Sequence, residues 1–252
     1  MEFKIVAIKA AKTAGNILKS EFFRPQNVKV KTKHDVVSDA DYKSEKTIIK
    51  IIKDNFPEHN IIAEESGNEH KKSEFSWYID PLDGTSNFVI GNPYFSVSIA
   101  LAKNNEVILG VVFNPILNEL YIAEKGKGAL LNNKPISVSS TQIMSDSFIA
   151  SAYSSDEKNI KKGLKVIEKL ALNSRKVVIN FSPALNLCNI ARGRIEALVD
   201  NGTTPEDHAA GSLIVIEAGG KIQNYGSKTW NINKIGIIAS NCKIHNSILK
   251  LI

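Results

Sequence analysis

The sequence predicts a mixed α/β protein, with an α+β arrangement in its first half and an α/β arrangement in its second half. Two amphipathic helical patterns open the chain, and short apolar segments separated by tight turns follow them. After about residue 145, strand-like and helical segments alternate, which is typical of a layered α/β unit. The 252 residues are 43% hydrophobic and 23% charged, which suits one large domain or two closely packed halves.

The two helices of the first half are predicted from residue spacing and from capping residues. In the first, apolar side chains recur every three or four positions, at Phe3, Val6, Ala7, Ala10, Ala14, Ile17 and Leu18. The second follows Ser38, because Ser38 and Asp41 resemble a capping box, and it ends at Pro57. Its predicted buried face consists of Ala40, Ser44, Thr47, Ile48, Ile51 and Ile52.

Five strands are predicted after these helices. Their apolar runs are NIIAEE (60–65), FSWYID (75–80), FSVSIALA (95–102), EVILGVVFN (106–114) and ELYIAE (119–124). Asn104-Asn105 and Asn132-Asn133 favour tight hairpin turns, because asparagine tolerates a positive φ. The first half is therefore expected to contain an antiparallel meander.

The second half has strand patterns at 147–153, 176–180, 195–200 and 235–240, and helical patterns at 156–172, 183–191, 206–218 and the C-terminus. We therefore divide the chain into residues 1–145 and 146–252. No flexible linker marks the boundary. The two halves are expected to pack tightly as one unit.

Charge and cysteine content exclude several other classes of protein. The net charge is +6, but the densest basic stretch, Lys29–His34, alternates like a strand and predicts a solvated strand face, not a nucleic-acid groove. Cys188 and Cys242 belong to no CxxC or Cys/His cluster, which argues against a disulfide framework and a zinc site. Charged residues interrupt the apolar ones near the N-terminus, and no run reaches transmembrane length, so a cytoplasmic protein without membrane contact is expected.

Acidic residues stand at the ends of predicted strands and at a helix start. Glu64 closes one strand, Asp80 and Asp83 close the next, and Asp207 lies in the first turn of a later helix. Such positions can aim side chains into a shared crevice. Each motif alone has a structural explanation, since D-P-L-D-G is a good β-turn sequence and acids are favoured at helix N-termini. Their joint occurrence favours a functional site.

Carboxylates gathered in one pocket need a counter-charge. At about 4 Å, two like charges repel by roughly 4 kcal/mol at an effective dielectric constant near 20. No suitably placed histidine or cysteine accompanies these acids, and oxygen-only ligands favour hard cations, Mg²⁺ first and then Mn²⁺ or Ca²⁺. With two or three Mg²⁺ ions bound, the pocket would attract a phosphate group and activate a water molecule.

The stretch from Pro81 to Ser86 refines this expectation. Gly84 permits a backbone conformation that a Cβ would block, and the amides of Gly84, Thr85 and Ser86 are expected to face a phosphate oxygen at a helix start. The spacing is D-x-x-D-G-T, whereas haloacid-dehalogenase phosphatases have D-x-D-G-T with the first Asp as nucleophile. Pro81 stands at that nucleophile position. Direct attack by a metal-activated water is therefore favoured over a phosphoaspartyl intermediate.

These motifs together resemble the inositol monophosphatase family, and its bacterial branch in particular. The first motif comprises Ala63-Glu64-Glu65-Ser66 with D-P-L-D-G-T-S-N-F at 80–88, and the second E-D-H-A-A-G at 206–211 with E-A-G-G at 217–220. The resemblance covers essentially the whole chain. It implies a layered αβαβα sandwich, usually dimeric, with Mg²⁺-dependent and lithium-sensitive phosphatase activity.

The resemblance also assigns expected roles to residues. The implied metal ligands are Glu64, Asp80, the Leu82 carbonyl, Asp83 and Asp207. The implied catalytic residues are Glu64 and Thr85, which orient the attacking water, and Asp41, which supports Thr85. The expected substrate contacts are Gly84, Thr85, Ser86, Ser182, Asp200 and Asp207.

Two departures from the family pattern concern the substrate. Glu206 replaces the usual tryptophan before Asp207, and Phe181-Ser182-Pro183 replaces the usual Gly-[ST]-Ala. Inositol 1-phosphate is the expected substrate, since Ser86-Asn87 differs from the Lys-Glu of relatives that act on nucleotide bisphosphates. Alternatives are fructose 1,6-bisphosphate, histidinol phosphate and adenosine 3′,5′-bisphosphate, or a regulatory role, because bacterial relatives associate with the transcription and ribosomal-RNA machinery.

Overall fold

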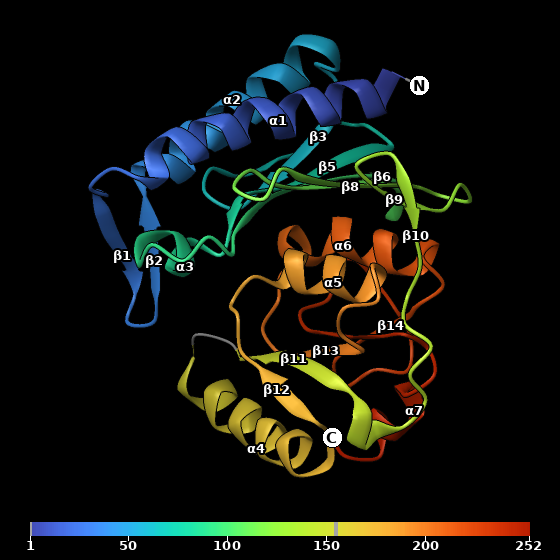
Figure 1. The fold of residues 1–252 in the computed structure, drawn as a ribbon. Coiled ribbons are helices and arrows are strands. Elements are labelled where there is room, and N and C mark those ends of the chain that lie inside the picture. Colours follow the sequence, from blue (N-terminus) through green and yellow to red (C-terminus); the bar gives the residue numbers. More distant parts are fainter. Residues whose placement is uncertain (1, 154–155) are drawn as a thin grey trace.

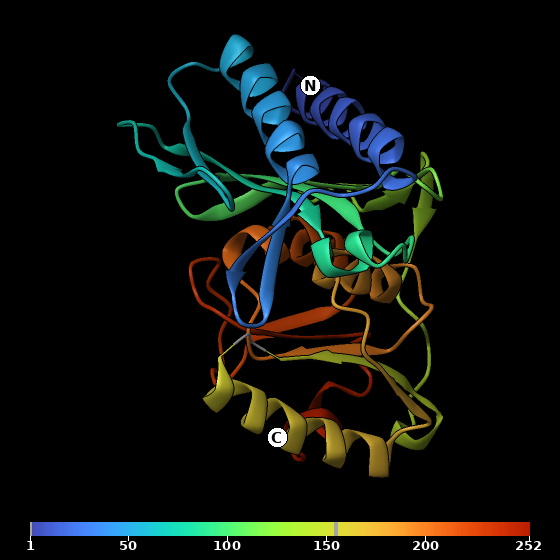
Figure 2. The same cartoon turned by 90° about the vertical axis from the view of Figure 1, so that its left-hand side faces the viewer.

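The structure, a computed structural model that describes residues 2–153 and 156–252, is built in five layers (Figure 1). A pair of helices covers a large sheet, a second pair lies beneath that sheet, a smaller sheet follows, and further helices close the opposite end (Figure 2). The predicted αβαβα sandwich is confirmed.

The first half supplies the outer helix pair, the large sheet and a short hairpin. Its helices are α1 (Glu2–Phe22), α2 (Asp39–Asn55) and the short α3 (Thr85–Val89). Its strands are β1 (Val28–Thr32), β2 (Asp35–Ser38), β3 (Asn60–Ala63), β4 (Gly67–Glu69), β5 (Phe75–Asp83), β6 (Ser96–Lys103), β7 (Glu106–Asn114), β8 (Glu119–Glu124), β9 (Ala129–Leu131) and β10 (Lys134–Ile136). Ser38 caps α2 with the predicted capping box.

The large sheet has the strand order β10-β9-β8-β7-β6-β5-β3-β4. Most neighbours are antiparallel, and Asn104, Asn105, Asn132 and Asn133 adopt positive φ in the predicted turns. The expected meander is wrong at one pair, because β3 runs parallel to β5. The edge strand β4 runs antiparallel to β3, so the chain returns to the end of the sheet where β3 began before β5 starts. Parallel pairing brings the carboxyl ends of β3 and β5 to the same edge of the sheet.

The second half supplies the inner helices, the smaller sheet and the outer helices at the opposite end. Its helices are the 3₁₀ turn η1 (Met144–Asp146), α4 (Glu157–Asn173), α5 (Pro183–Ala191), α6 (Pro205–Glu217) and α7 (His245–Leu249). Its strands are β11 (Phe148–Ala152), β12 (Lys176–Val178), β13 (Ala197–Asp200), β14 (Lys221–Asn224) and β15 (Ile237–Ser240), in the order β12-β11-β13-β15-β14. The strand β14 was not predicted. Strands β11 and β13 are parallel, so their carboxyl ends also share one edge.

Alternation along the strands divides the core between the layers. Trp77 and Ile79 of β5 pack with α1 and α2, while Tyr78 packs with α5 and α6. In the smaller sheet, Leu198 faces the inner helices and Val199 faces the outer ones. Each sheet is buried on both faces, which explains its nearly continuous apolar runs.

The close approach of α6 to the large sheet depends on a glycine. A Cβ on Gly110 of β7 would lie 2.5 Å from the carbonyl oxygen of Ala210. Glycine is therefore the residue that lets the helix carrying Asp207 lie directly on the sheet.

The predicted boundary at residue 145 falls between β10 and β11, where the chain passes from one sheet to the other. Residues of both halves contribute to the core around α5 and α6. The division into two units stays a prediction. Among the described residues, no helix combines the length and the hydropathy needed to cross a membrane.

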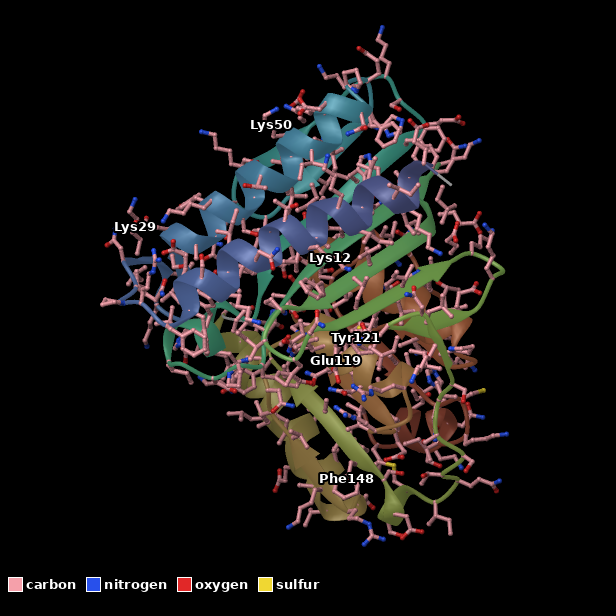
Figure 3. All side chains as sticks on the ribbon, turned by 45° about the horizontal axis from the view of Figure 1, so that its top comes forward. Lys12, Lys29, Lys50, Glu119, Tyr121 and Phe148 are labelled. Carbon is pink, nitrogen blue, oxygen red and sulfur yellow. The ribbon has the colours of Figure 1, made fainter. Side chains whose placement is uncertain are left out.

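Basic side chains are dispersed over the outer surface. Lys12 on α1, Lys29 on β1 and Lys50 on α2 are exposed and lie apart from one another (Figure 3). These three lysines therefore do not form one basic patch.

Candidate active site

The predicted acidic residues gather around one open pocket of about 250 Å³. The pocket lies where β3, β5 and β13 end and where α6 begins. Of the predicted site residues, those that line it are Glu64, Asp80, Leu82, Asp83, Gly84, Thr85, Ser86, Asp200 and Asp207. The carboxyl ends of the parallel pairs β3–β5 and β11–β13, one pair in each sheet, therefore border the same pocket.

An irregularity in β5 turns Asp80 and Asp83 toward the same pocket. In a regular strand, residues three apart point to opposite faces. Here Asp80 pairs with Ser98 and Asp83 with Ser96, so β5 has one residue more than β6 over this interval. The extra residue forms a bulge around Pro81, whose missing N–H removes one ladder hydrogen bond. Asp80 then accepts a hydrogen bond from the Leu82 amide at 2.9 Å.

Gly84 and Thr85 begin the short helix α3 beside the bulge. Gly84 has φ = +94°, and a Cβ there would lie 3.0 Å from the Tyr94 carbonyl oxygen. The Thr85 hydroxyl lies 2.9 Å from Asp41 Oδ1 and 3.0 Å from the Leu82 carbonyl oxygen, and it can donate to either. Asp41 is fully buried and does not line the pocket, and its hydrogen bond with Thr85 connects it to the site.

Asp83 is held by hydroxyl groups from two separate elements. Ser96 of β6 donates to its Oδ2 at 2.9 Å, and Ser182, just before α5, donates to the same oxygen. Ser182 was expected among the substrate contacts, but it is fully buried beneath the pocket. Its observed partner is the carboxylate of Asp83.

The other two aspartates are anchored by backbone amides. Asp207 accepts a hydrogen bond from the Thr204 amide at 2.8 Å, which fixes it in the first turn of α6. Asp200 accepts from the amides of Gly202 and Thr203 at 2.8 and 3.2 Å. Both carboxylates are therefore oriented by the chain before any ligand is bound.

The aspartates of the pocket resist ionisation. Burial, followed by repulsion from Glu64 and neighbouring aspartates, raises the pKa of Asp80 well above its ordinary value. Burial is also the main cause that raises the pKa of Asp207, and it raises that of Asp83 to about 6. In the described part of the chain, neither Asp80, Asp83 nor Asp207 forms an ion pair with a lysine or arginine. The pocket therefore lacks a compensating positive charge at its aspartates.

Lys31 is a site neighbour that the sequence did not reveal. It lies on β1, and its ammonium group contacts Glu64 at 3.0 Å and also pairs with Glu65. Burial alone would lower its pKa, but the two glutamates outweigh that effect and raise it. The predicted basic strand is confirmed up to Thr32, where β1 ends, and most of it is exposed as predicted, but the Lys31 side chain is only 24% exposed.

The two departures from the family pattern lie in different places. Phe181 and Pro183 line the pocket, and Phe181 contacts Tyr153, which also lines it and was not predicted. Glu206 faces a separate polar pocket with Tyr78 and Asn233, although it precedes Asp207. A ligand in the acidic pocket would therefore contact Phe181, whereas Glu206 faces a different pocket.

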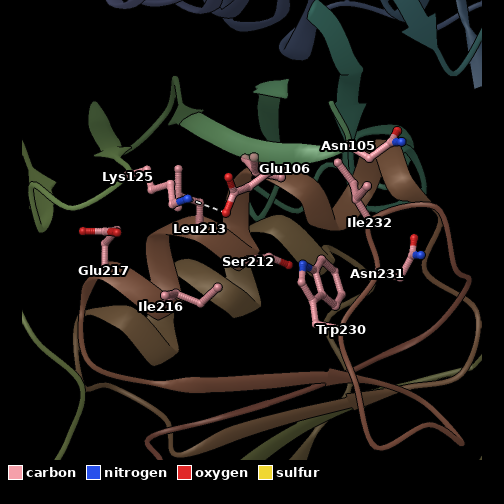
Figure 4. A pocket seen from close by; sticks show the side chains of 11 residues that line it. Asn105, Glu106, Lys125, Ser212, Leu213, Ile216, Glu217, Trp230, Asn231 and Ile232 are labelled. Atoms are coloured by element: carbon pink, nitrogen blue, oxygen red, sulfur yellow. Dashed lines mark hydrogen bonds and ion pairs between the residues drawn. The ribbon is translucent and has the colours of Figure 1, made fainter. Parts of the chain in front are cut away.

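A larger cavity lies away from the acidic pocket. It has a volume of about 430 Å³ and is bordered by the β6–β7 turn, α6 and the segment 230–232 (Figure 4). Lys125 and Glu106 form an ion pair at its edge, and Trp230 forms part of its wall. It contains none of the predicted site residues, so size alone does not identify the chemical centre.

The donor set around the smaller pocket suits a hard cation. Carboxylate and carbonyl oxygens line it together with one histidine, His34, and neither cysteine of the chain does. Within residues 2–153 and 156–252, no three His, Cys, Asp or Glu side chains form a ready-made metal cage. Mg²⁺ does not require one, because it commonly keeps several water ligands and takes only one or two carboxylates from the protein.

Comparisons with known proteins agree with the fold and with the motifs. The family model described as "Inositol monophosphatase family" matches residues 1–252. The chain is 37% identical to the fructose-1,6-bisphosphatase/inositol-1-monophosphatase of Thermotoga maritima, over 98% of this chain and 94% of that protein. It is 36% identical to Nus factor SuhB of Haemophilus influenzae, with the same coverage. The crystal structure of extragenic suppressor protein suhB from Bartonella henselae superposes with a TM-score of 0.94 at 31% identity, over 100% of this chain and 98% of that one.

Proposed function

The chain belongs to the inositol monophosphatase family, and from this premise we propose that it is a Mg²⁺-dependent phosphatase of small phosphate monoesters, with inositol 1-phosphate as the first candidate substrate. One observation carries the proposal. Asp80 and Asp83 are buried and Asp207 is half-buried around one pocket, and among the described residues none of the three forms an ion pair with a lysine or arginine. Such an arrangement is unfavourable unless a cation is bound.

The metal ligands in this proposal are Glu64, Asp80, Asp83, Asp207 and the Leu82 carbonyl. When bound, Mg²⁺ would lower the pKa of a water molecule and offset the negative charge of the phosphate. Glu64 would exchange its ion pair with Lys31 for this role. Lithium sensitivity and a dimeric state are further parts of the proposal that come from the family.

The protein's own contribution to the reaction is orientation and proton handling. When Thr85 donates its hydroxyl hydrogen to Asp41, its oxygen lone pairs remain available to accept a hydrogen from a water molecule in the pocket. The acceptor is held ready, because Ser38 donates to Asp41 through its amide at 2.8 Å and its hydroxyl at 2.6 Å. Together with Glu64, Thr85 would orient the attacking water and help to move its proton.

Substrate binding is assigned to both sides of the pocket. The amides at the start of α3, from Gly84 to Ser86, would hold phosphate oxygens, since the first N–H groups of a helix lack partners within it. Across the pocket, the anchored Asp200 would accept hydrogen bonds from hydroxyl groups of the alcohol. Asp207 would contact the substrate next to its metal-binding position.

The pocket lining favours monophosphates among the alternatives. No lysine or arginine is found among its described lining residues. A second phosphate, as in fructose 1,6-bisphosphate or adenosine 3′,5′-bisphosphate, would meet carboxylates in place of a cationic partner. Histidinol phosphate is not disfavoured on this ground, because its amine is positively charged.

A phosphate-release panel tests the proposal. Inositol 1-phosphate and the three alternative substrates are offered with Mg²⁺, with Mn²⁺ and with EDTA. We expect Mg²⁺-dependent release that Asp83→Asn abolishes and that Asp146→Asn preserves, since Asp146 is a surface residue paired with Arg175. Full activity of Asp83→Asn, or no release from any monoester, would refute the assignment.

A regulatory role is a second candidate, because one relative is named a Nus factor. It predicts that the Asp83→Asn protein, although inactive as a phosphatase, still co-purifies with RNA polymerase or its elongation factors. Capture of neither by wild type or variant would remove this candidate.

A further inference from the structure

One wall of the active-site pocket is aromatic, although its floor is acidic. Phe181 and Tyr153 both line the pocket, and their rings form an edge-to-face pair with centroids 5.6 Å apart at an angle of 83°. In such a pair, one ring presents its edge to its partner, so the partner does not cover the faces of that ring. Phe181 is 41% exposed, so an aromatic surface is open to the ligand.

The backbone at Phe181 has a conformation that a bulky residue rarely adopts. Its φ is +46°, in the left-handed region that glycine occupies without cost. Strained residues of this kind persist where the surroundings hold them, and they cluster at functional sites. Here the strain holds an exposed phenyl ring beside the carboxylates, where a glycine would leave only backbone.

The wall next to the aromatic one provides hydrogen-bond acceptors, because Asp200 pairs across the sheet with Ala152, the residue before Tyr153. Asp200 is fixed by the amides of Gly202 and Thr203 and faces the same pocket. A ligand that matches both walls has hydroxyl groups on one part and a flat ring on another. The ring is uncharged or cationic, since the remaining lining residues are acidic or neutral apart from His34.

We propose that this pocket selects nucleoside monophosphates, with the ribose hydroxyls at Asp200 and the base against Phe181 and Tyr153. The inference rests on the proposed phosphatase function and names its substrate class. Stacking of a base on an aromatic side chain strengthens binding without reading the base sequence. Inositol carries hydroxyl groups but no flat ring, so it would use only one of the two walls.

The test compares two substrates that differ only by the base. Adenosine 5′-monophosphate and ribose 5-phosphate present the same phosphate on the same sugar carbon. We expect kcat/KM to be on the order of tenfold higher for the nucleotide, as one base–aromatic stack provides. Because the ratio compares two substrates of one enzyme, any general damage to the phosphatase chemistry cancels.

Three variants locate the effect. Phe181→Gly removes the ring, and Phe181→Leu keeps an apolar side chain without an aromatic face; both should reduce the ratio toward one. Phe148→Leu is the matched control, because Phe148 is 40% exposed but lies at the start of β11, outside the pocket lining. It should keep the wild-type ratio.

The outcomes separate this inference from the proposed function. A wild-type ratio near one, an unchanged ratio in Phe181→Gly, or hydrolysis of inositol 1-phosphate with no hydrolysis of the nucleotide would each overturn the substrate class and leave the phosphatase standing. If no monoester is hydrolysed at all, the proposed function fails first. Hydrolysis of the nucleotide alone would support the inference most strongly.

Discussion

Replacing Asp83 by asparagine should stabilise the metal-free protein while it abolishes metal binding. The pKa of Asp83 is raised from 3.8 to about 6, chiefly by burial. Because a tenfold change in a proton equilibrium corresponds to about 1.4 kcal/mol, keeping this carboxylate ionised costs the folded protein about 3 kcal/mol at neutral pH. Asparagine has no such cost.

The hydrogen bonds around Asp83 reduce the expected gain. Ser96 and Ser182 donate to Oδ2 of Asp83. If asparagine places its NH₂ group at that position, both hydroxyls must turn so that they accept. We allow about 1 kcal/mol for this rearrangement. The net gain is then about 2 kcal/mol, or roughly 4–8 °C in melting temperature for a chain of this size.

The sign of the pH dependence is part of the prediction. A carboxyl whose pKa is higher in the folded state binds its proton more tightly there, so its unfavourable contribution is absent below pH 3.8 and complete above about pH 6. The advantage of Asp83→Asn over wild type should therefore develop between these values. Urea denaturation in EDTA at pH 4 and pH 8 measures it.

Adding Mg²⁺ completes the experiment. Wild type should gain stability in proportion to the logarithm of the metal concentration, whereas Asp83→Asn should not respond. If Asp83→Asn is less stable than wild type in EDTA at pH 8, the buried-charge reasoning is refuted. If both proteins respond equally to Mg²⁺, Asp83 is not a ligand.

Three other substitutions test separate parts of the structure. Lys31→Met should lower the Mg²⁺ concentration for half-maximal phosphate release several-fold, because Lys31 competes for Glu64, while Lys29→Met should not; a raised requirement contradicts this. Thr85→Val should lower kcat by about 10²-fold or more with little change in KM, and Thr85→Ser should retain activity. If Thr85→Val and wild type had equal kcat values, the Thr85 hydroxyl would take no part in the reaction. Gly110→Ala should cost about 1–3 kcal/mol in urea denaturation, because its Cβ would lie 2.5 Å from the Ala210 oxygen, and an unchanged midpoint would contradict that packing.

The elements were predictable wherever the hydrophobic period was regular and the ends were marked. The helix at 183–191 was predicted with the boundaries that α5 has, since Pro183 begins it and an apolar run defines its length. The capping box of Ser38 and Asp41 was predicted from two residues three apart. Both signals are local, so the sequence carries them in full.

The features that sequence reasoning missed depend on contacts between distant segments. The parallel pairing of β3 with β5 follows from the edge strand β4, which has only three residues and no apolar pattern. Lys31 lies 33 residues from Glu64, and one lysine of a basic strand gives no sign of such a contact. Glu45 is buried and its carboxylate accepts from the Glu65 amide, a partner that is likewise set by tertiary structure.

The acidic character of the pocket and its proposed use on phosphate esters are two aspects of one electrostatic problem. A phosphate dianion approaching Asp80, Asp83 and Asp207 is repelled unless positive charge arrives first or with it. Burial raises the pKa values of all three aspartates in the folded chain, and repulsion from Glu64 and neighbouring carboxylates adds to the shift at Asp80 and Asp207. A cation that relieves the repulsion therefore stabilises the fold and admits the substrate through the same interactions. By thermodynamic linkage, phosphate must then strengthen Mg²⁺ binding by the factor by which Mg²⁺ strengthens phosphate binding.

Aromatic contacts at Phe181 stand outside this coupling, because stacking does not depend on the charge of the pocket. Affinity for the phosphate and choice of the alcohol are thus assigned to different walls, and substitutions in one wall should leave the other function measurable.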